Sequence, residues 1–229
     1  MQLSRSLTLR SRVSSSFAIT DVSGLQLWLK HNTGQGTITD GIQWADSSAN
    51  NRQASQTLEA QEGSGFSGGA FVTDAGNQDN LDLATTFDLT GAYHIFAVLD
   101  FSEESNETFV SSVDNTSFIR FAQAGTATAY RMKNGGTTLN LTLSSGFGTT
   151  KAIAEISRNA SNSVTVLKDG TSLGTGTGSG TFEFEQIGTS SNGVTSGEIH
   201  EVVVFNTLLT GSDLTNVRND IADRNGITI

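Results

Sequence analysis

The feature that most constrains this fold is a series of strand-like runs that recur at short intervals through the middle of the chain. Each run is rich in β-branched, aromatic and aliphatic residues, and turn formers such as Asp169 and Gly170 separate the runs. The clearest ones cover residues 107–113, 117–123, 126–133, 137–143, 151–158 and 162–170. Short strands at this spacing predict a sandwich or barrel rather than a parallel α/β sheet.

The strongest single strand signal is the run AYHIFAVLDF at residues 92–101. Its apolar side chains occupy both parities, so we expect a central strand that is covered on both sides. The apolar positions of this and the other strong runs are expected to point into the sandwich: Leu27, Phe96, Val98, Ile153, Val164, Val202 and Val204.

The C-terminal part of the chain changes from a strand pattern to a helix pattern. Residues 197–205, GEIHEVVVF, predict a buried strand, and Leu214, Val217 and Ile221 then follow helical spacing. Thr210 or Ser212 is placed to cap this helix, and Gly226 is placed to end it.

Composition narrows the class of protein and its partners. The 229 residues include no cysteine and no proline, so the chain has no disulfide framework and its turns depend on Gly, Asn and Asp. The net charge of −10 argues against nucleic acid as a partner, because phosphate binding needs Lys and Arg. No window approaches the ~18 apolar residues of a membrane span. We therefore expect neither nucleic acid nor membrane as a partner.

Three segments together resemble one known family. The run GLQLWLKHNTGQG at residues 24–36, the run WADSSANNRQASQ at residues 44–56 and the closing strand and helix resemble the concanavalin A-like (laminin G-like) jelly-roll domains of bacterial and phage surface proteins. The resemblance covers roughly Ser23 to Ile229. It implies an all-β, two-sheet antiparallel jelly-roll sandwich over residues 21–229, preceded by an arm at residues 1–20 and closed by a short helix. Asp46 lies in the family's Trp-x-Asp-x-Ser turn and is expected to make a local turn.

The resemblance also raises the question of catalysis, because glycoside hydrolases with this fold carry a Glu-x-Asp-x-x-Glu run. Here the run starts at Glu198, but His200 replaces the aspartate and Val203 replaces the last glutamate. Glu198 and Glu201 are three residues apart, so a regular strand would point them to opposite faces. We therefore predict that the chain is not an enzyme and that Glu201 is structural.

Metal binding is an open alternative at one place in the sequence. His31, His94 and His200 are too scattered to suggest a transition-metal site by their spacing. Carboxylate and amide oxygens that could bind Ca²⁺ are grouped in one acidic loop, at Asp74, Asn77, Asp79 and Asp82. The same residue types are ordinary turn formers, so no cofactor is expected other than this calcium ion.

Aromatic side chains are the natural platforms for sugar rings, and Trp28 and Trp44 are the candidates for glycan binding. Trp28 points away from the row formed by Leu25, Leu27 and Leu29, so it is either exposed or packed against the N-terminal arm. A structural role for both tryptophans is the alternative.

The N-terminal 20 residues differ in charge from the rest of the chain. They contain three arginines and no acidic residue, whereas the remaining chain carries 10 basic and 23 acidic residues. We expect this arm to bind a partner through apolar and basic side chains, namely Leu3, Arg5, Leu7, Leu9, Arg10 and Arg12.

These features together favour a non-enzymatic structural protein of a virion. We expect a phage capsid decoration (cement) protein, attached through its arm to capsid or other virion proteins at the particle surface. Such a protein would be present as a homo-oligomer or as symmetric copies. The alternative is a glycan-binding adhesin or a tail-fibre receptor-binding module.

Overall fold

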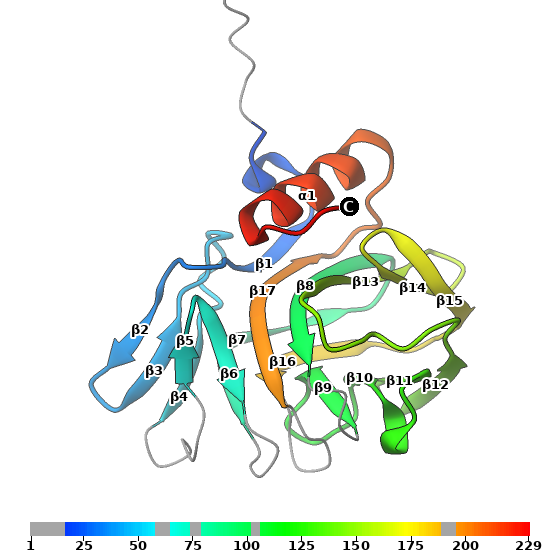
Figure 1. Cartoon of the computed structure of the whole chain (residues 1–229), viewed down its shortest axis with the longest axis horizontal. Coiled ribbons are helices and arrows are strands. Elements are labelled where there is room, and N and C mark those ends of the chain that lie inside the picture. Colours follow the sequence, from blue (N-terminus) through cyan, green and yellow to red (C-terminus); the bar gives the residue numbers. More distant parts are fainter. Residues whose placement is uncertain (1–16, 58–64, 74–78, 102–105, 189–195) are drawn as a thin grey trace, which may run out of the picture.

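A computed structural model of the chain describes residues 17–57, 65–73, 79–101, 106–188 and 196–229. These residues form two stacked β-sheets with one α-helix lying on the outer face of one sheet (Figure 1). The predicted arm residues Leu3, Arg5, Leu7, Leu9, Arg10 and Arg12 lie outside the described part of the chain. The predicted all-β sandwich with a short C-terminal helix is confirmed.

The first sheet, sheet A, has eight strands and carries the helix. In spatial order it contains β15 (Thr171–Thr177), β14 (Ser163–Lys168), β13 (Ala152–Arg158), β8 (Tyr93–Phe101), β17 (Gly197–Phe205), β6 (Ala70–Thr73) and β5 (Gly65–Ser67), with β1 (Leu25–Leu29) also paired to β17. The second sheet, sheet B, has nine strands: β12 (Thr137–Thr142), β11 (Ala129–Asn134), β10 (Phe118–Phe121), β9 (Glu107–Ser111), β16 (Phe182–Gly188), β7 (Asn80–Leu89), β4 (Ala54–Thr57), β3 (Gly41–Trp44) and β2 (Gln35–Ile38).

The hairpin of β14 and β15 illustrates how local sequence sets an antiparallel strand pairing. Asp169 and Gly170 have φ angles of 48° and 77°, the left-handed pair that a tight two-residue hairpin turn requires. This turn joins β14 to β15, as the sequence predicts. The glycine-rich run after it forms the edge strand β15, where a Cβ at Gly176 would lie 2.5 Å from the Leu141 side chain. Glycine there lets the two sheets approach each other closely.

The apolar interior lies between the two sheets. It contains four of the residues expected there, Leu27, Val164, Val202 and Val204. The other three, Phe96, Val98 and Ile153, are also buried but lie on the opposite face of sheet A, so their predicted direction is wrong. The reason is that β8 and β13 are covered on both faces, and alternate residues of such strands enter different cores.

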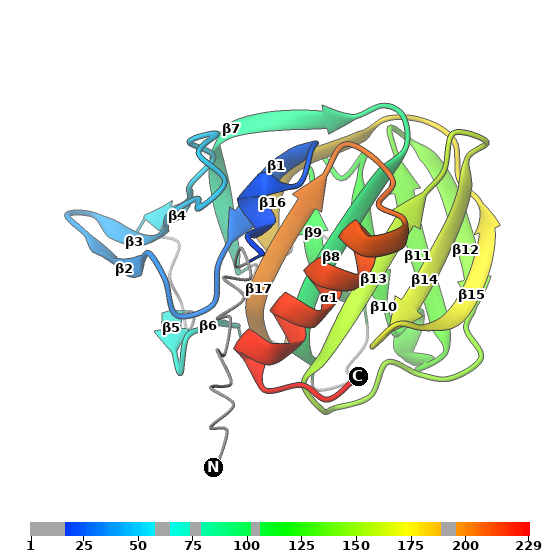
Figure 2. The ribbon, with the colours of Figure 1, turned by 90° about the horizontal axis from the view of Figure 1, so that it is seen from above.

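The helix α1 (Gly211–Asn225) makes this second core by lying across β17, β8 and β13 (Figure 2). Val217 and Ile221 have no exposed surface and pack in the same cluster as Phe96 and Val98. Burying an aliphatic side chain of this size stabilises the fold by about 1.5–3 kcal/mol. Gly226 ends the helix as predicted, with φ 65°, and the amide of the next residue donates to the Ala222 carbonyl.

The first described residues pack against the sandwich. A short 3₁₀ helix covers Ile19–Asp21, and the Ile19 side chain has no exposed surface. Phe17 packs against the same cluster. These apolar side chains complete the core under α1, and the predicted boundary at residue 20 stays a prediction.

In the parts of the chain that the structure describes, none of the helices has the length and hydrophobicity that a membrane crossing requires.

Candidate functional site

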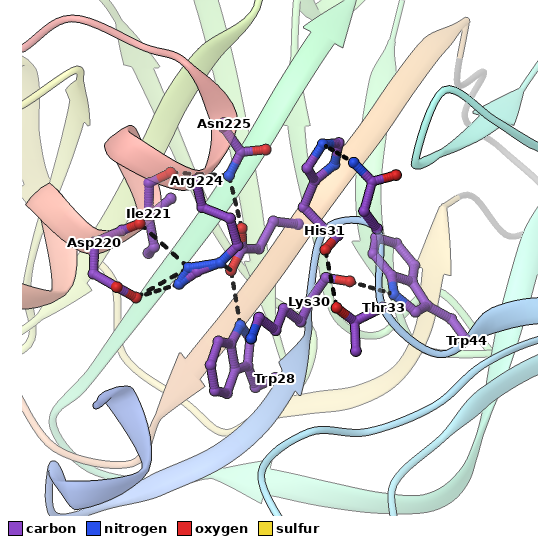
Figure 3. A network of polar contacts seen from close by, with 11 residues as sticks. Trp28, Lys30, His31, Thr33, Trp44, Asp220, Ile221, Arg224 and Asn225 are labelled. Atoms are coloured by element: carbon purple, nitrogen blue, oxygen red, sulfur yellow. Dashed lines mark hydrogen bonds and ion pairs between the residues drawn. The ribbon is translucent and has the colours of Figure 1, made fainter. Parts of the chain in front are cut away.

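The candidate site is built around Glu201, whose carboxylate joins β17 to β1 and α1. The Trp28 indole Nε1 donates to Glu201 Oε1 at 2.7 Å, and the Asn225 amide donates to Glu201 Oε2 at 2.7 Å. The Arg224 Nε lies 3.6 Å from Glu201 Oε1. Figure 3 shows Trp28, Arg224 and Asn225 converging on this point. Burial raises the pKa of the Glu201 carboxyl, and the contacts with Arg224, Trp28 and Asn225 oppose that shift.

This arrangement bears on the predicted role of Glu201. Both of its oxygens accept hydrogen bonds from neighbouring elements, and only 1% of the residue is exposed. A catalytic acid or nucleophile has to reach its substrate. The geometry is that of a structural link between helix and sheet.

The direction of the two glutamates differs from the prediction. Glu198 is paired with Asp100, and Glu201 is paired with Val98, with a register shift between them. Val98 and Asp100 are two residues apart on β8, so both glutamates lie on the outer face of sheet A. A β-bulge at His200 adds one residue to β17 and reverses the expected alternation.

Trp28 lies beneath α1 and is 7% exposed. Two cations lie over its ring: the Lys30 ammonium is 4.8 Å from the ring centroid, and the Arg224 guanidinium is 5.1 Å from it. The ring therefore makes cation–π contacts with two charged side chains. Those cations and Glu201 occupy part of its surroundings, and glycan binding by Trp28 stays a prediction.

A cleft of about 520 Å³ opens beside this tryptophan, between α1, β1 and the first described residues. Apolar and charged side chains share its wall: Phe17, Ala18, Ile19, Trp28, Lys30, Asp220, Asp223 and Arg224. A neighbouring hollow of about 280 Å³ adds Asn216 and Asn219. The cleft therefore presents aromatic surface, carboxylates, amides and cations together.

The helix residues of this cleft do not stand out in the sequence as a candidate site. Asn216 lies four residues before Asp220, and Asn219 lies four residues before Asp223, so the four share one face of α1. That spacing was a usable signal, but solvated polar helix faces are common. Only the position of Phe17 and Trp28 beside this face shows that it borders a cleft.

Trp44 has no exposed surface and lies in the core between the sheets. Its indole Nε1 donates to the Lys30 carbonyl at 3.0 Å. The predicted glycan contact of Trp44 is wrong, because neither face of the ring can be reached.

Asp46 makes the local turn that the family resemblance implies. Its Oδ1 accepts from the Trp28 and Ser48 amides at 3.0 and 2.8 Å, and its Oδ2 accepts from the Arg52 amide at 3.0 Å. This carboxylate holds the turn after β3 against β1 and thereby fixes the position of Trp28.

The predicted calcium loop is described only in part. Asp74 and Asn77 lie outside the described residues. Asp79 is fully buried, and Asp82 Oδ1 accepts from the Gln186 amide at 2.7 Å and from the Asn80 amide at 2.8 Å. Asp82 thus has a structural role in pairing β7 with β16, and calcium binding by this loop stays a prediction.

Comparison with known proteins gives a fold but no family. No protein family matches the sequence, and no curated protein matches it. The concanavalin A-like name therefore remains a resemblance. Solved structures do match the fold, and they include toxin binding domains and a sialidase.

Three of these solved structures illustrate the similarity. The binding domain of botulinum neurotoxin serotype D has a TM-score of 0.61 at 11% identity, over 88% of this chain and 52% of that chain. The binding domain of Paraclostridial Mosquitocidal Protein 1 has a TM-score of 0.60 at 14% identity, over 89% and 53%. A Trypanosoma rangeli sialidase has a TM-score of 0.57 at 11% identity, over 92% and 34%. This chain thus spans about half the length of the toxin domains, and the likeness is one of fold.

Proposed function

We propose that this chain is a non-catalytic module that binds a glycan in the cleft between α1 and β1. The observation that carries the proposal is the mixed lining of that cleft, where Phe17 and Trp28 lie beside Asp220, Asp223 and the cations of Lys30 and Arg224. Ligand sites combine apolar surface with a few convergent polar groups in this way. A sugar offers the same combination, because apolar C–H faces alternate with hydroxyls that donate and accept hydrogen bonds.

The solved structures of similar fold support a glycan over other ligands. The binding domain of botulinum neurotoxin DC is described in complex with SialylT. For the type C neurotoxin, dependence on interaction with two ganglioside molecules is described. Function does not follow from fold alone, so these neighbours support the ligand class and the lining of the cleft supports the proposed location.

The non-catalytic part of the proposal rests on the β17 carboxylates. A retaining glycosidase needs two carboxyl groups about 5–5.5 Å apart that both reach the sugar. Here His200 and Val203 replace two of the three family carboxylates, and Glu201 is engaged with Trp28 and Asn225.

A glycan array followed by calorimetry tests this function. The full chain should bind at least one glycan, and Asp223→Asn or Asn219→Ala should each weaken that binding about 5–10-fold, as expected for the loss of one hydrogen bond. Both side chains are exposed on α1, so the variants should fold normally. Asp40→Asn, at the exposed turn between β2 and β3, is the matched control and should bind like the unaltered chain.

Two results would contradict the proposal. Absence of binding to every glycan at millimolar concentration, or equal binding by the cleft and control variants, would remove the cleft as the site. Hydrolysis of a sialylated substrate by the purified chain would refute the non-catalytic assignment.

Attachment to a capsid, and a place on the surface of a virion as symmetric copies, stay predictions. They depend on residues 1–16, which lie outside the described part of the chain. The glycan module, which was the alternative to decoration, is the function that the cleft favours.

A further inference from the structure

A second polar cluster lies on the outer face of sheet A, where β8 and β17 run side by side. It contains the carboxylates of Asp100 and Glu198 and the imidazole of His200, with one ligand atom from each residue within 4.8 Å of the others. None of the three residues lines the cleft beside α1. The glycan proposal therefore does not involve them.

Strand pairing and regular alternation bring these side chains together, next to the β-bulge in β17. Glu198 lies directly opposite Asp100 in the antiparallel ladder, and the register then shifts before Glu201. Glu198 and His200 are two residues apart and share a face. Bulges of this kind re-aim side chains and are frequent beside functional sites.

The carboxylate pair is unfavourable unless a cation lies nearby. Like charges directly opposite each other on neighbouring strands destabilise a sheet. The positive charge of Lys151 acts on both His31 and His200, against the two carboxylates of the cluster. The cluster keeps a net negative charge, which attracts a cation.

The His200 imidazole is buried at this point without a hydrogen bond. Its side chain is 7% exposed, and both ring nitrogens lack a hydrogen-bond partner among the described residues. His200 Nε2 lies 3.1 Å from Glu198 Oε2, outside hydrogen-bonding geometry. A neutral imidazole offers the lone pair of one ring nitrogen to a cation.

We propose that Asp100, Glu198 and His200 bind a divalent transition-metal ion, with Zn²⁺ as the expected ion. One imidazole nitrogen and two carboxylate oxygens form a ligand set that suits zinc, and three protein ligands leave one position for water. Two atoms bound to the same tetrahedral zinc ion at about 2.1 Å lie about 3.4 Å apart. The three ligand atoms lie within 4.8 Å of one another, so the two partly exposed carboxylates have to rotate toward the imidazole when the ion binds.

The same ligand set predicts selectivity. Ca²⁺ takes six to eight oxygen ligands and Mg²⁺ retains several waters, so neither ion gains from the buried imidazole. Zn²⁺ and Co²⁺ bind imidazole well. We expect the site to bind Zn²⁺ and Co²⁺ at least tenfold more tightly than Ca²⁺.

Calorimetric titration of the chelator-treated full chain with Zn²⁺ tests the site. The unaltered chain should bind one Zn²⁺ ion, and Asp100→Asn and Glu198→Gln should each weaken binding at least tenfold. Both residues are partly exposed, so these variants should fold even where a change at buried His200 does not. Asp88→Asn is the matched control, because it removes an exposed carboxylate from β7 in sheet B, and it should bind Zn²⁺ like the unaltered chain.

Co²⁺ gives an independent readout, because nitrogen and oxygen ligation changes its visible absorption. The change should appear with the unaltered chain and with Asp88→Asn, and it should be lost with Asp100→Asn. Absence of Zn²⁺ binding at about 1 mM would overturn the proposal. Equal affinity in site and control variants, or Ca²⁺ affinity equal to that for Zn²⁺, would overturn it as well.

Discussion

Arg218→Met should lower the free energy of unfolding more than any surface substitution on α1, because Arg218 neutralises a buried carboxylate. Its Nε donates to Glu155 Oε1 at 2.6 Å and its Nη2 donates to Glu155 Oε2 at 2.8 Å. Glu155 lies on β13 with no exposed surface, whereas the Arg218 side chain is 19% exposed. The substitution keeps most of the aliphatic stem but removes both charge-assisted hydrogen bonds.

The size of the effect follows from the charge that is left behind. Removing one partner of a buried ion pair costs about 3–5 kcal/mol, since the other charge remains uncompensated. Arg218 is partly exposed and water can enter its place, so we expect about 3 kcal/mol, at the lower end of that range. In a chain of this size that corresponds to a fall in Tm of roughly 6–12 °C.

Urea denaturation followed by tryptophan fluorescence measures this loss, because Trp28 and Trp44 are both buried. The double variant Arg218→Met with Glu155→Gln should recover at least about 1 kcal/mol of it, since the neutral amide needs no counter-charge. A loss below about 1 kcal/mol, or a double variant that is less stable than Arg218→Met, would refute the reasoning.

The pH dependence gives a second check on the same pair. Burial by itself raises the pKa of the Glu155 carboxyl, but its contacts with His94 and Arg218 outweigh burial and lower it. The unaltered pair therefore stabilises the fold above the ordinary glutamate pKa, and this stability is lost as the pH falls through the lower, folded-state value. In Arg218→Met the effect of burial dominates and raises the pKa of the Glu155 carboxyl. Protonation of Glu155 then removes the uncompensated buried charge and reduces the destabilisation of the variant. The stability difference between the two proteins should be largest at neutral pH and should narrow on acidification; a constant difference would contradict the assignment.

Two further substitutions test the packing and the end of α1. Ile19→Ala should lower the free energy of unfolding by about 2–5 kcal/mol in urea denaturation, because Ile19 is fully buried in the core under α1. A loss below about 1 kcal/mol would contradict the packing of Ile19 in that core. Gly226→Ala should cost about 1 kcal/mol, since φ is 65° and a Cβ there meets no other atom, so only the left-handed backbone is penalised. Gly36→Ala, at an exposed glycine without positive φ, is its control and should change stability by less than 0.5 kcal/mol; an equal effect at both sites would contradict a backbone origin.

The sequence by itself determined the elements and the class of fold. Strand runs, hairpin turns and the change to helical spacing depend on neighbouring residues, so they can be read locally. The hairpin at Asp169 and Gly170, the central strand β8 and the helix end at Gly226 all follow from such patterns. The turn made by Asp46 followed from a motif of five residues.

Only the tertiary structure decided which face each apolar residue enters and which polar residues meet. Phe96 and Val98 look like interior residues in sequence, but the helix that covers them is more than 100 residues away in the chain. The direction of Glu201 relative to Glu198 depends on a bulge, which changes the alternation by one residue and leaves no mark in the hydrophobic pattern.

The burial of the two tryptophans shows the same limit for the candidate site. Trp28 and Trp44 look alike in sequence, yet one borders a cleft and the other fills the core. Exposure depends on what other segments pack against a side chain, here α1, Phe17 and the opposite sheet. Contacts of that kind join residues far apart along the chain, so local sequence can nominate a site residue, and only the fold can place it at a surface.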